Sequence, residues 1–346
     1  MKCIVTGNHG FIGYFLVHEL LKAGHEVTGI DVDYFPKKAF GRNDLFSSSD
    51  RIAQLNKDIR DITVNDLIGY DAVFHLAALP NDPAGDIDPN VTEDINYLAT
   101  VQLGIASKRA GVERFIFASS CSVYGVNGEQ QINENSGTYP ITAYAVSKLN
   151  SEKALLSMSS RSFAVSCMRN ATCYGVSPRM RFDMVLNNFM AYLVTTGKIR
   201  ILSDGKSWRP LIHVEDVARA YAIMLESDID SIYSEIFSIG SENFTVRDLA
   251  NVARSAVEGA EIEYVKDGPK DMRSYKVNFN KFQKMTDFKP VWTAKQGAKE
   301  LYDACIEYGL NVDKFNDTSF WAGKQLQKLL NSNMIDSHFR FVKRIE

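Results

Sequence analysis

Three kinds of side chain that can move a proton lie near the middle of the chain. Tyr144 and Lys148 are four residues apart in a segment that predicts a helix, so they share one helix face. Ser119 and Ser120 close an apolar segment, 114–118, that predicts a strand. An ammonium lowers the pKa of a nearby phenol, so the phenol can take an alcohol proton while a serine holds the oxygen. A pair exposed on a helix surface is the alternative for Tyr144 and Lys148.

Three glycines in the sequence TGNHGFIG could hold a phosphate group. Gly7, Gly10 and Gly13 follow the predicted strand Lys2–Thr6 and open a predicted helix, 11–23. Glycines there permit a tight turn, a close approach of backbone to a pyrophosphate, and packing of helix on strand. The helix N-terminus adds free N–H groups and a positive dipole end. The spacing is GxxGxxG rather than GxGxxG, and a turn whose glycines serve packing alone is the alternative.

An acidic residue ends the second predicted strand. Asp31 closes Glu26–Asp31, and an acid at this place can accept hydrogen bonds from an adenosine ribose and repel a 2′-phosphate. Asp33 is a second candidate for the same role, and a solvated loop carboxylate is the alternative for either residue. The order of strand, glycine loop, helix, strand and acid favours NAD over NADP as a cofactor, and a nicotinamide could take the hydride of an alcohol whose proton goes to Tyr144.

Short apolar strands alternate with helices through the first half of the chain. Near-continuous apolar strands separated by helices predict a parallel sheet covered on both faces, a doubly wound α/β sheet of the Rossmann type. Its carboxyl edge, where Ser119 and Ser120 fall, is where such sheets bind ligands. Gly24 stands where a glycine ends a helix. The predicted strands are 2–6, 26–31, 71–76, 114–118 and 165–168, and a helix is predicted over 143–156.

The second half lacks this repetition. Helices are predicted over 179–197, 214–225 and 246–257, and strands over 198–202 and 236–239. This pattern predicts a smaller mixed α/β C-terminal substrate lobe, with some segments returning to the sheet. We therefore expect an NAD-binding Rossmann domain at 1–170, a mainly substrate-binding lobe at 171–310, and a C-terminal extension of unassigned role at 311–346.

Composition narrows the class of protein. Among 346 residues, Lys+Arg number 39 and Asp+Glu 42, for a net charge of −3, which argues against nucleic acid as a partner. No run of 18 apolar residues occurs and MKCIVTG lacks the apolar core of a secretion signal, so neither a membrane span nor export is expected. The five cysteines are scattered without a CxxC pair, and none of His9, His75 or His213 has metal-ligand spacing, so no metal site is predicted. A reduced, cytoplasmic enzyme or binding protein remains.

Six motifs in one order carry a family resemblance. They are TGNHGFIG, KDIRD at 57–61, HLAA at 75–78, SSCSVYG at 119–125, YAVSK at 144–148 and WRPLIHVEDVA at 208–218. This order resembles the extended short-chain dehydrogenase/reductase family, in its NAD-dependent sugar-nucleotide epimerase/dehydratase branch, in the style of UDP-glucose 4-epimerase. The similarity covers roughly residues 1–310.

The resemblance implies roles for the chemistry-bearing residues. Tyr144 would be the catalytic base and acid, Lys148 its tuning partner and a ribose ligand, and Ser120 the residue that holds the hydroxyl. Ser120 is preferred over Ser119 because it lies four residues before Tyr124 in the SxxVYG pattern. Asp58 and Ile59 would contact the adenine, and Asn96 would fall in the helix that braces the cleft. The implied NAD-binding residues are Gly7, Gly10, Phe11, Ile12, Gly13, Asp31, Asp58, Ile59, Leu76, Ala77, Ala78, Asn96, Ser119, Tyr144 and Lys148.

The implied substrate is a nucleotide-diphosphate sugar, gripped by the second lobe. Arginine suits a diphosphate because its planar fork donates two hydrogen bonds at once. For Arg273 a surface arginine is the alternative. A homodimer is implied by the resemblance alone. The implied substrate-binding residues are Ser120, Tyr144, Thr172, Asn188, Arg209 and Arg273.

Departures from the family pattern narrow the reaction. Sugar 4,6-dehydratases of this family carry acids just after the active-site hydroxyl residue, whereas this chain has Cys121 and Ser122, which argues against dehydration. We read Cys121 as a small buried apolar residue. Pro80 and Thr172 differ from the residues that 4-epimerases usually carry, so the sugar and the nucleotide stay open.

Three functions remain at this point. The first is NAD-dependent epimerisation of a nucleotide-linked sugar, at C4, through a transient 4-keto intermediate. The second is NAD(P)H-dependent 4-ketoreduction of a nucleotide deoxy-sugar. The third is a non-catalytic dinucleotide-sensing scaffold, although such proteins usually lose the Tyr or the Lys that stand here.

Overall fold

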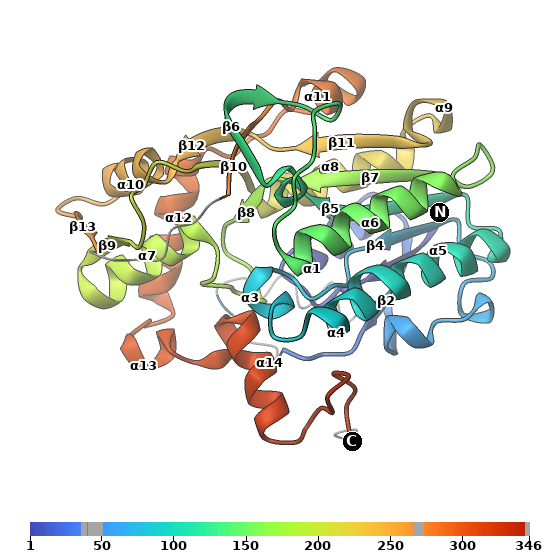
Figure 1. Cartoon of the computed structure of the whole chain (residues 1–346), viewed down its shortest axis with the longest axis horizontal. Coiled ribbons are helices and arrows are strands. Elements are labelled where there is room, and N and C mark those ends of the chain that lie inside the picture. The colour runs from blue at the N-terminus through green and yellow to red at the C-terminus, as the bar shows by residue number, and fades with distance from the viewer. Residues whose placement is uncertain (36–39, 41–50, 266–272, 343–346) are drawn as a thin grey trace.

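A seven-stranded parallel sheet forms the centre of the molecule (Figure 1). The computed structural model describes residues 1–35, 40, 51–265 and 273–342. The strand order reverses between β1 and β4, which creates the crevice where doubly wound sheets bind ligands. The predicted fold class is thereby confirmed. In spatial order the strands are β11 (Glu235–Ile239), β7 (Ala164–Asn170), β5 (Arg114–Ser120), β4 (Ala72–His75), β1 (Lys2–Thr6), β2 (Glu26–Asp31) and β3 (Ala53–Asn56).

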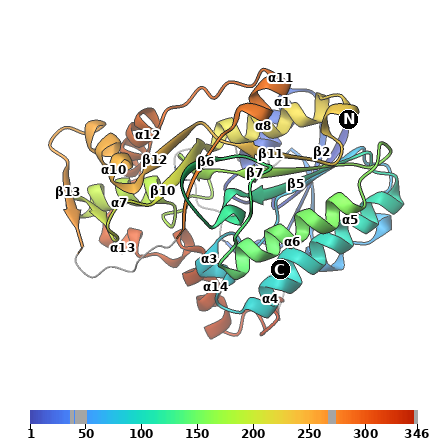
Figure 2. The same ribbon diagram turned by 45° about the horizontal axis from the view of Figure 1, so that its top comes forward.

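Helices cover both faces of this sheet, with α1 (Gly13–Lys22) and α8 (Val214–Glu226) on one side and α5 (Ala99–Ala110) and α6 (Ala143–Ser157) on the other (Figure 2). The side chains of β1 alternate accordingly. Cys3 and Val5 pack with the apolar residues of α1 and α8, whereas Ile4 packs with those of α5 and α6. Every residue of β1 after Lys2 is buried, as expected for a strand covered on both faces.

The end of α1 shows why this first βαβ unit could be predicted. Gly24 has a φ of +82°, and the N–H groups of Gly24 and His25 donate to the carbonyls of Leu21 and Leu20, each at 3.0 Å. This is the glycine-terminated hydrogen-bond pattern that ends many helices, so the predicted role of Gly24 is confirmed.

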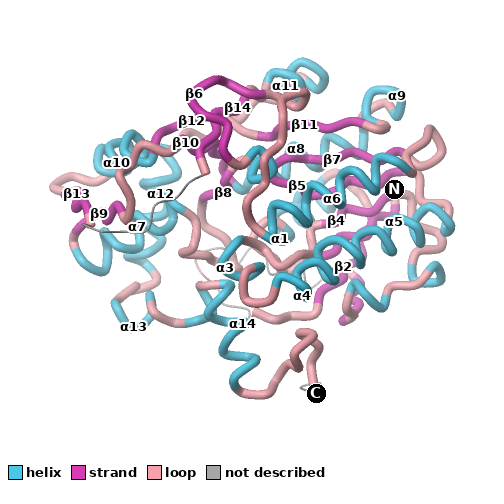
Figure 3. Tube along the Cα trace, viewed as in Figure 1, coloured by secondary structure: helices cyan, strands magenta, loops and turns pink. Residues whose placement is uncertain are grey.

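The second half of the chain, together with β6 from the first half, builds a smaller lobe from three small sheets and the helices around them (Figure 3). Strand β11 returns to the edge of the central sheet, where it pairs with β7. The lobe's sheets are β12 (Glu242–Thr245)–β10 (Trp208–His213)–β8 (Thr172–Tyr174), β13 (Glu261–Tyr264)–β9 (Lys198–Ile201) and β14 (Ser274–Val277)–β6 (Val126–Ile132). The helices packed on them are α7 (Val185–Thr196), α10 (Val246–Ser255) and α12 (Ala294–Glu307). The boundaries at 170 and 310 stay a prediction.

The predicted helix over 179–197 is wrong in its first part. Helix α7 begins only at Val185, and residues 179–184 are not helical. In this segment Met180 and Phe182 are buried in the lobe's core, whereas Arg179, Arg181 and Asp183 line a cavity. Alternate side chains of this segment therefore point to opposite sides, a repeat of two residues that an extended segment has and a helix does not.

The remaining helices are short, apart from one near the end of the chain. No described helix is long and apolar enough to cross a membrane. The others are α3 (Asp82–Gly85), α4 (Pro89–Glu93), α9 (Ile229–Ile232), α11 (Asn280–Thr286), α13 (Val312–Phe315) and α14 (Ala322–Asn331).

Candidate active site

A cavity of about 750 Å³ lies between the carboxyl edge of the central sheet and the smaller lobe. This volume falls in the upper part of the range of roughly 300–1,000 Å³ found for small-molecule sites. Nearly all residues predicted from the sequence line it. These are Gly7, Gly10, Phe11, Ile12, Gly13, Asp31, Asp58, Ile59, Leu76, Ala77, Ala78, Ser119, Ser120, Tyr144, Lys148, Thr172, Asn188, Arg209 and Arg273.

Asn96 is the predicted site residue that does not line the cavity. It lies in a π-helical turn, Asp94–Leu98, between α4 and α5, and is 1% exposed. Its side-chain amide accepts from the N–H of Leu79 at 2.7 Å and donates to the carbonyl of Leu79 at 3.1 Å. Leu79 does line the cavity. Asn96 therefore supports the cavity wall through Leu79 but does not itself line the cavity.

The glycine loop is shaped by close packing. Gly7 has a φ of +72°, and a Cβ there would lie 2.8 Å from the backbone nitrogen of Ala77. A Cβ on Gly13 would overlap the carbonyl oxygen of Gly7. Helix α1 follows with no side-chain cap and no acid in its first turn, and its first residues face the cavity. An uncapped helix N-terminus beside an open cavity fits the pyrophosphate of a dinucleotide.

Two carboxylates stand beside this loop. Asp31 accepts hydrogen bonds from the N–H groups of His9 at 3.2 Å and Asp33 at 2.9 Å, and burial raises its pKa. Asp33 pairs with Nδ1 of His9 at 2.5 Å. These bonds fix Asp31 at the strand end, which supports it over Asp33 as the ribose ligand. The three side chains bring their possible ligand atoms within 4.8 Å of one another, and the hydrogen bonds among them account for that proximity.

The predicted adenine contacts lie on a 3₁₀ turn, η1 (Ile59–Asp61). Asp58 caps this turn and accepts from the backbone N–H of Arg60 at 2.9 Å and from its guanidinium at 3.0 and 2.6 Å. Burial acts to raise the pKa of Asp58, but the hydrogen bonds and charge of Arg60 outweigh burial, and the pKa lies below its usual value. Asp58 is therefore a fixed, charged acceptor on the cavity wall.

Ser120, Tyr144 and Lys148 meet at the end of β5. The Ser120 hydroxyl lies close enough to the phenol of Tyr144 to influence its pKa, and it accepts from the N–H of Ser122 at 3.1 Å. The Lys148 ammonium donates to the carbonyl of Ala118 at 2.7 Å and lies 5.8 Å from the centre of the Tyr144 ring. Helix α6 places Tyr144 and Lys148 because Thr142 caps its N-terminus, accepting from Ala145 at 3.2 Å.

The expected lowering of the phenol's pKa by Lys148 is wrong for this structure. Burial raises the pKa of Tyr144 to about 12, although the Ser120 hydroxyl and the charge of Arg181 oppose that rise. Burial also lowers the pKa of Lys148 to about 7, so its charge is itself disfavoured. Lys148 is 3% exposed, and burial outweighs the charge of Glu152, which acts to raise the pKa of Lys148.

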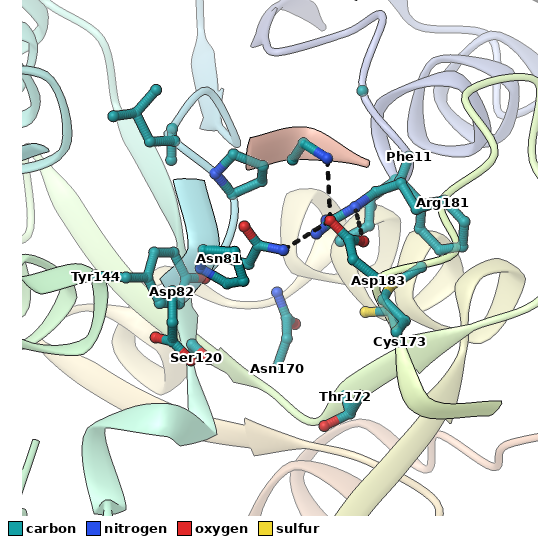
Figure 4. Close-up of a pocket in the computed structure, with 18 of the residues that line it drawn as sticks. Phe11, Asn81, Asp82, Ser120, Tyr144, Asn170, Thr172, Cys173, Arg181 and Asp183 are labelled. Carbon is teal, nitrogen blue, oxygen red and sulfur yellow. Dashed lines mark hydrogen bonds and ion pairs between the residues drawn. The ribbon is translucent and has the colours of Figure 1, made fainter. Parts of the chain in front are cut away.

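The structure separates the two adjacent serines. Ser119 donates to Glu152, which forms a buried ion pair with Arg169 at 2.7 Å. Ser120 instead faces Tyr144 across the cavity edge (Figure 4). This placement supports Ser120 as the residue that holds the substrate hydroxyl.

The part of the cavity predicted to hold the sugar, called the sugar end below, contains charged residues that the sequence did not predict. Asp183 accepts from Nε of Arg181 at 2.9 Å, from the side chain of Asn81 at 2.7 Å, and from the N–H of Ala322 at 3.2 Å (Figure 4). Arg181 is 12% exposed and Asp183 8%. The alternation of polar and apolar residues in RMRFDM was the signal that could have placed these side chains on one face of an extended segment.

The predicted diphosphate arginines lie close together. Nη1 of Arg209 donates to the carbonyl of Arg273 at 2.6 Å and to that of Trp208 at 2.7 Å. The guanidinium of Arg273 pairs with Asp82, which also accepts from Thr142 at 2.6 Å. A diphosphate bound here would either replace the Asp82 carboxylate as the partner of Arg273 or share the guanidinium with it.

His75, His213 and Cys121 have structural roles in the fold. His75 is fully buried between the hydroxyls of Thr6 at 2.7 Å and Thr100 at 2.8 Å, and burial lowers its pKa to about 3. His213 caps α8 by accepting from Glu215. Cys121 is 1% exposed, and burial raises the pKa of its thiol.

Comparison with known proteins identifies the family of this chain. A model of the NAD dependent epimerase/dehydratase family matches residues 3–240. The chain belongs to this family. The uncharacterized UDP-glucose epimerase YtcB of Bacillus subtilis is 31% identical over 65% of this chain and 72% of its own length. UDP-glucuronic acid decarboxylase 1 of Arabidopsis thaliana is 26% identical over 91% of this chain and 72% of its own length.

Solved structures extend the likeness to three dimensions. The UDP-glucuronic acid 4-epimerase of Bacillus cereus in complex with UDP-glucuronic acid and NAD is 25% identical, with a TM-score of 0.77 over 89% of this chain and 100% of its own. The family resemblance inferred from the motifs is confirmed. This chain is therefore an NAD-dependent enzyme of sugar-nucleotide chemistry. The glycine loop, the uncapped helix and Asp31 fit NAD as its cofactor.

Proposed function

We propose that this enzyme epimerises a UDP-linked hexose at C4 through a transient 4-keto sugar. The observation that carries the proposal is the meeting of Ser120, Tyr144 and Lys148 on the cavity that the glycine loop also lines. The reaction needs a group beside the dinucleotide that takes a proton from the sugar and later returns it. The phenol of Tyr144, on the same cavity as the glycine loop, would be that group. The roles given to the individual cavity residues are part of this proposal.

Tyr144 would handle the proton of the sugar's C4 hydroxyl. As a phenolate it accepts that proton, the C4–H bond breaks with loss of hydride, and the C4–O bond becomes a ketone. Bound NAD⁺ supplies the hydride acceptor and a positive ring charge that favours the phenolate. Ser120 holds the same oxygen by a hydrogen bond, which fixes its distance from Tyr144.

Epimerisation requires the ketone to turn over in the site before C4 is reduced on its other face. Tyr144 then returns its proton to the oxygen, so the enzyme ends each cycle as it began. The cavity's walls at the sugar end are side chains of the smaller lobe and of the loop after β4, among them Asn81 and Thr172. The grip on the nucleotide would come from Arg209 and Arg273, which can hold the diphosphate while the sugar turns.

Arg181 favours a sugar with an acidic C6 group. Its Nε is taken by Asp183, and its Nη groups have no partner among the residues that the structure describes. The Ser122 hydroxyl is buried on the cavity wall and lacks a hydrogen-bond partner within the same described part of the chain. A guanidinium and a hydroxyl together suit a carboxylate. The similar structure from Bacillus cereus holds UDP-glucuronic acid, which makes UDP-glucuronate our first substrate to test.

Decarboxylation is the second candidate reaction. A uronate oxidised at C4 is a β-keto acid, because C6 lies two bonds from the ketone, and such acids lose carbon dioxide readily. One similar protein is named as a UDP-glucuronic acid decarboxylase. An epimerase must return hydride before the carboxylate is lost, and Arg181 is placed to hold a carboxylate in one orientation meanwhile.

The test is incubation of the purified enzyme with UDP-glucuronate or UDP-glucose without added cofactor. We expect the C4 epimer of the substrate as the product, detected by anion-exchange chromatography and proton NMR. Carbon dioxide release with a UDP-pentose product would instead establish the decarboxylase. Turnover of a 4-keto sugar only on addition of NADH or NADPH, with loss of nicotinamide absorbance, would establish the 4-ketoreductase. The homodimer implied by the resemblance stays a prediction that light scattering can check on the same sample.

A further inference from the structure

The last part of the chain forms a wall of the cavity. Helix α14 begins at Ala322, and the residues around its start, Trp321, Gly323 and Lys324, line the cavity. The N–H of Ala322 donates to Asp183, and a Cβ on Gly323 would lie 2.8 Å from the carbonyl oxygen of Pro83. The start of α14 is thus tightly seated beside the sugar end. Figures 1 and 2 show this segment running beneath α3 and α4.

The chain beyond α14 returns to the loop that follows β2. Tyr34, on the cavity wall three residues after Asp31, donates its hydroxyl to the carbonyl of Phe339. Its ring stacks on that of Phe341, with centres 5.5 Å apart. Gln325 of α14 donates to the carbonyl of Tyr34 at 3.3 Å. One wall of the adenosine side is therefore held by two parts of the C-terminal segment.

The same segment also binds the opposite wall, at η1. Nη1 of Arg60 donates to the carbonyl of His338 at 2.7 Å, while the rest of this guanidinium holds Asp58, the predicted adenine contact. Arg340 pairs with Asp61 at 2.8 Å. The C-terminal segment thus supports the residue that orients Asp58.

An apolar cluster lies beneath these polar contacts. Ile335 and Phe339 are 2% and 1% exposed, and they pack in one cluster with Ile59 of η1, Leu79 of the cavity wall and Leu326 of α14. Burial of aromatic and aliphatic side chains against η1 makes the segment part of the folded enzyme rather than a loose tail.

We propose that residues 321–342 form a C-terminal clamp that completes the adenosine side of the NAD site and slows release of NAD. The clamp joins the two walls, the loop after β2 and η1, so the adenosine end can open only when the clamp detaches from one of them. The match with the Bacillus cereus structure covers 100% of that chain but 89% of this one, so part of this chain has no counterpart there. Retention of NAD therefore need not work in the same way in relatives. The proposal rests on the family's cofactor and not on which sugar or carbon reacts.

The decisive variant is Arg340→Ala combined with Phe341→Ala, which removes one contact to each wall and leaves the buried Phe339 in place. Purified protein with NAD bound would be diluted into ethanol and yeast alcohol dehydrogenase, which turns released NAD into fluorescent NADH. We expect the release rate to rise by about tenfold or more, since loss of about 1.4 kcal/mol of holding energy changes a rate by that factor. Lys328→Ala, exposed on α14, is the matched control and should release NAD like the parent.

A second variant that ends at Asn333 removes every contact that His338, Phe339, Arg340 and Phe341 make with the two walls, while Gln325 remains, and it should retain less NAD through gel filtration. If it does not fold, the double variant alone decides. Release from the double variant at the parent's rate, with the same thermal melting curve by circular dichroism, would overturn the clamp. Faster release with normal epimerisation in added NAD supports it. An enzyme that holds NAD through these residues yet converts no UDP-hexose would contradict the proposed function and leave the clamp standing.

Discussion

The two ends of the cavity are built in different ways. At the cofactor end, much of the wall is backbone, glycines and apolar side chains at the ends of β1, β2 and β4, beside the hydrogen-bonded carboxylates of Asp31 and Asp58. Gly7 and Gly13 there cannot accept a Cβ without displacing backbone. At the sugar end, the wall is made of charged side chains that are already paired with each other, Arg181 with Asp183 and Arg273 with Asp82.

This difference indicates how each ligand is held. A backbone cradle has one shape and loses little conformational freedom when its ligand binds, which suits a cofactor that stays in place. Paired side chains must share or exchange partners when a diphosphate or carboxylate enters, which suits a substrate that turns over and leaves.

The largest expected effect comes from Tyr144, which stands where the two ends meet. Tyr144→Phe should lower kcat by about 10²- to 10⁴-fold, because the proton acceptor is lost. The purified protein should still contain NAD, since the glycine loop and Asp31 are untouched and the ring of residue 144 remains. Tyr139→Phe, at an exposed tyrosine, is the control. Turnover of the Tyr144 variant within a few-fold of the parent, measured by chromatography of the product, would refute the assigned role.

Gly13→Ala tests the rigidity of the cofactor end. The added Cβ would overlap the Gly7 carbonyl oxygen, so we expect a loss of about 1–3 kcal/mol in the free energy of unfolding and a purified protein depleted of NAD. Gly85→Ala is the matched control, because its Cβ would meet no atom nearer than 3.4 Å. Guanidinium denaturation and ultraviolet absorbance of the released nucleotide measure both effects. A variant as stable and as rich in NAD as the parent would mean that the loop can adjust.

Arg181→Gln tests the sugar end. The KM for UDP-glucuronate should rise by about tenfold, because a charge-assisted hydrogen bond to the carboxylate is lost. The KM for UDP-glucose and the NAD content should change little. Arg161→Gln, a replacement of an exposed arginine, is the control. Equal changes in KM for both substrates would show that Arg181 does not recognise C6.

The smallest expected effect is a pH dependence of stability from Lys148. Burial lowers its pKa from 10.5 to about 7, so above pH 7 the unfolded chain binds a proton that the folded chain does not. The free energy of unfolding of NAD-depleted enzyme should therefore rise between pH 7 and 8.5 through this group. In Lys148→Met that part of the rise should vanish. Parallel pH profiles in guanidinium denaturation for parent and variant would show that Lys148 is not held in a low-pKa state.

The cofactor end could be predicted from sequence because its signals are local. The bounds of β1 and β2 match the prediction, and Gly24 ends α1 as expected. Each of these features depends on a few adjacent residues, such as an apolar run, a glycine at a turn or an acid at a strand end. The order of those features then identified the fold and the cofactor.

The sugar end could not be predicted because it joins residues far apart in the chain. Asn81, Asp183 and Ala322 meet at one carboxylate, and Asp82 meets Arg273. No spacing in the sequence encodes such contacts. The pKa of Tyr144 was missed for a related reason, since burial by distant segments raises it, and the sequence does not show which residues bury it.

The central claim is that the hydride of C4 leaves and returns within one closed site. The direct measurement is epimerisation of UDP-glucuronate carrying deuterium at C4, in ordinary water without added cofactor, with the product examined by NMR and mass spectrometry. The account predicts that the deuterium stays on C4 of the inverted product and that no solvent hydrogen enters there. Replacement of that deuterium by solvent hydrogen would contradict the account, because the C4 hydrogen would then have left as a proton.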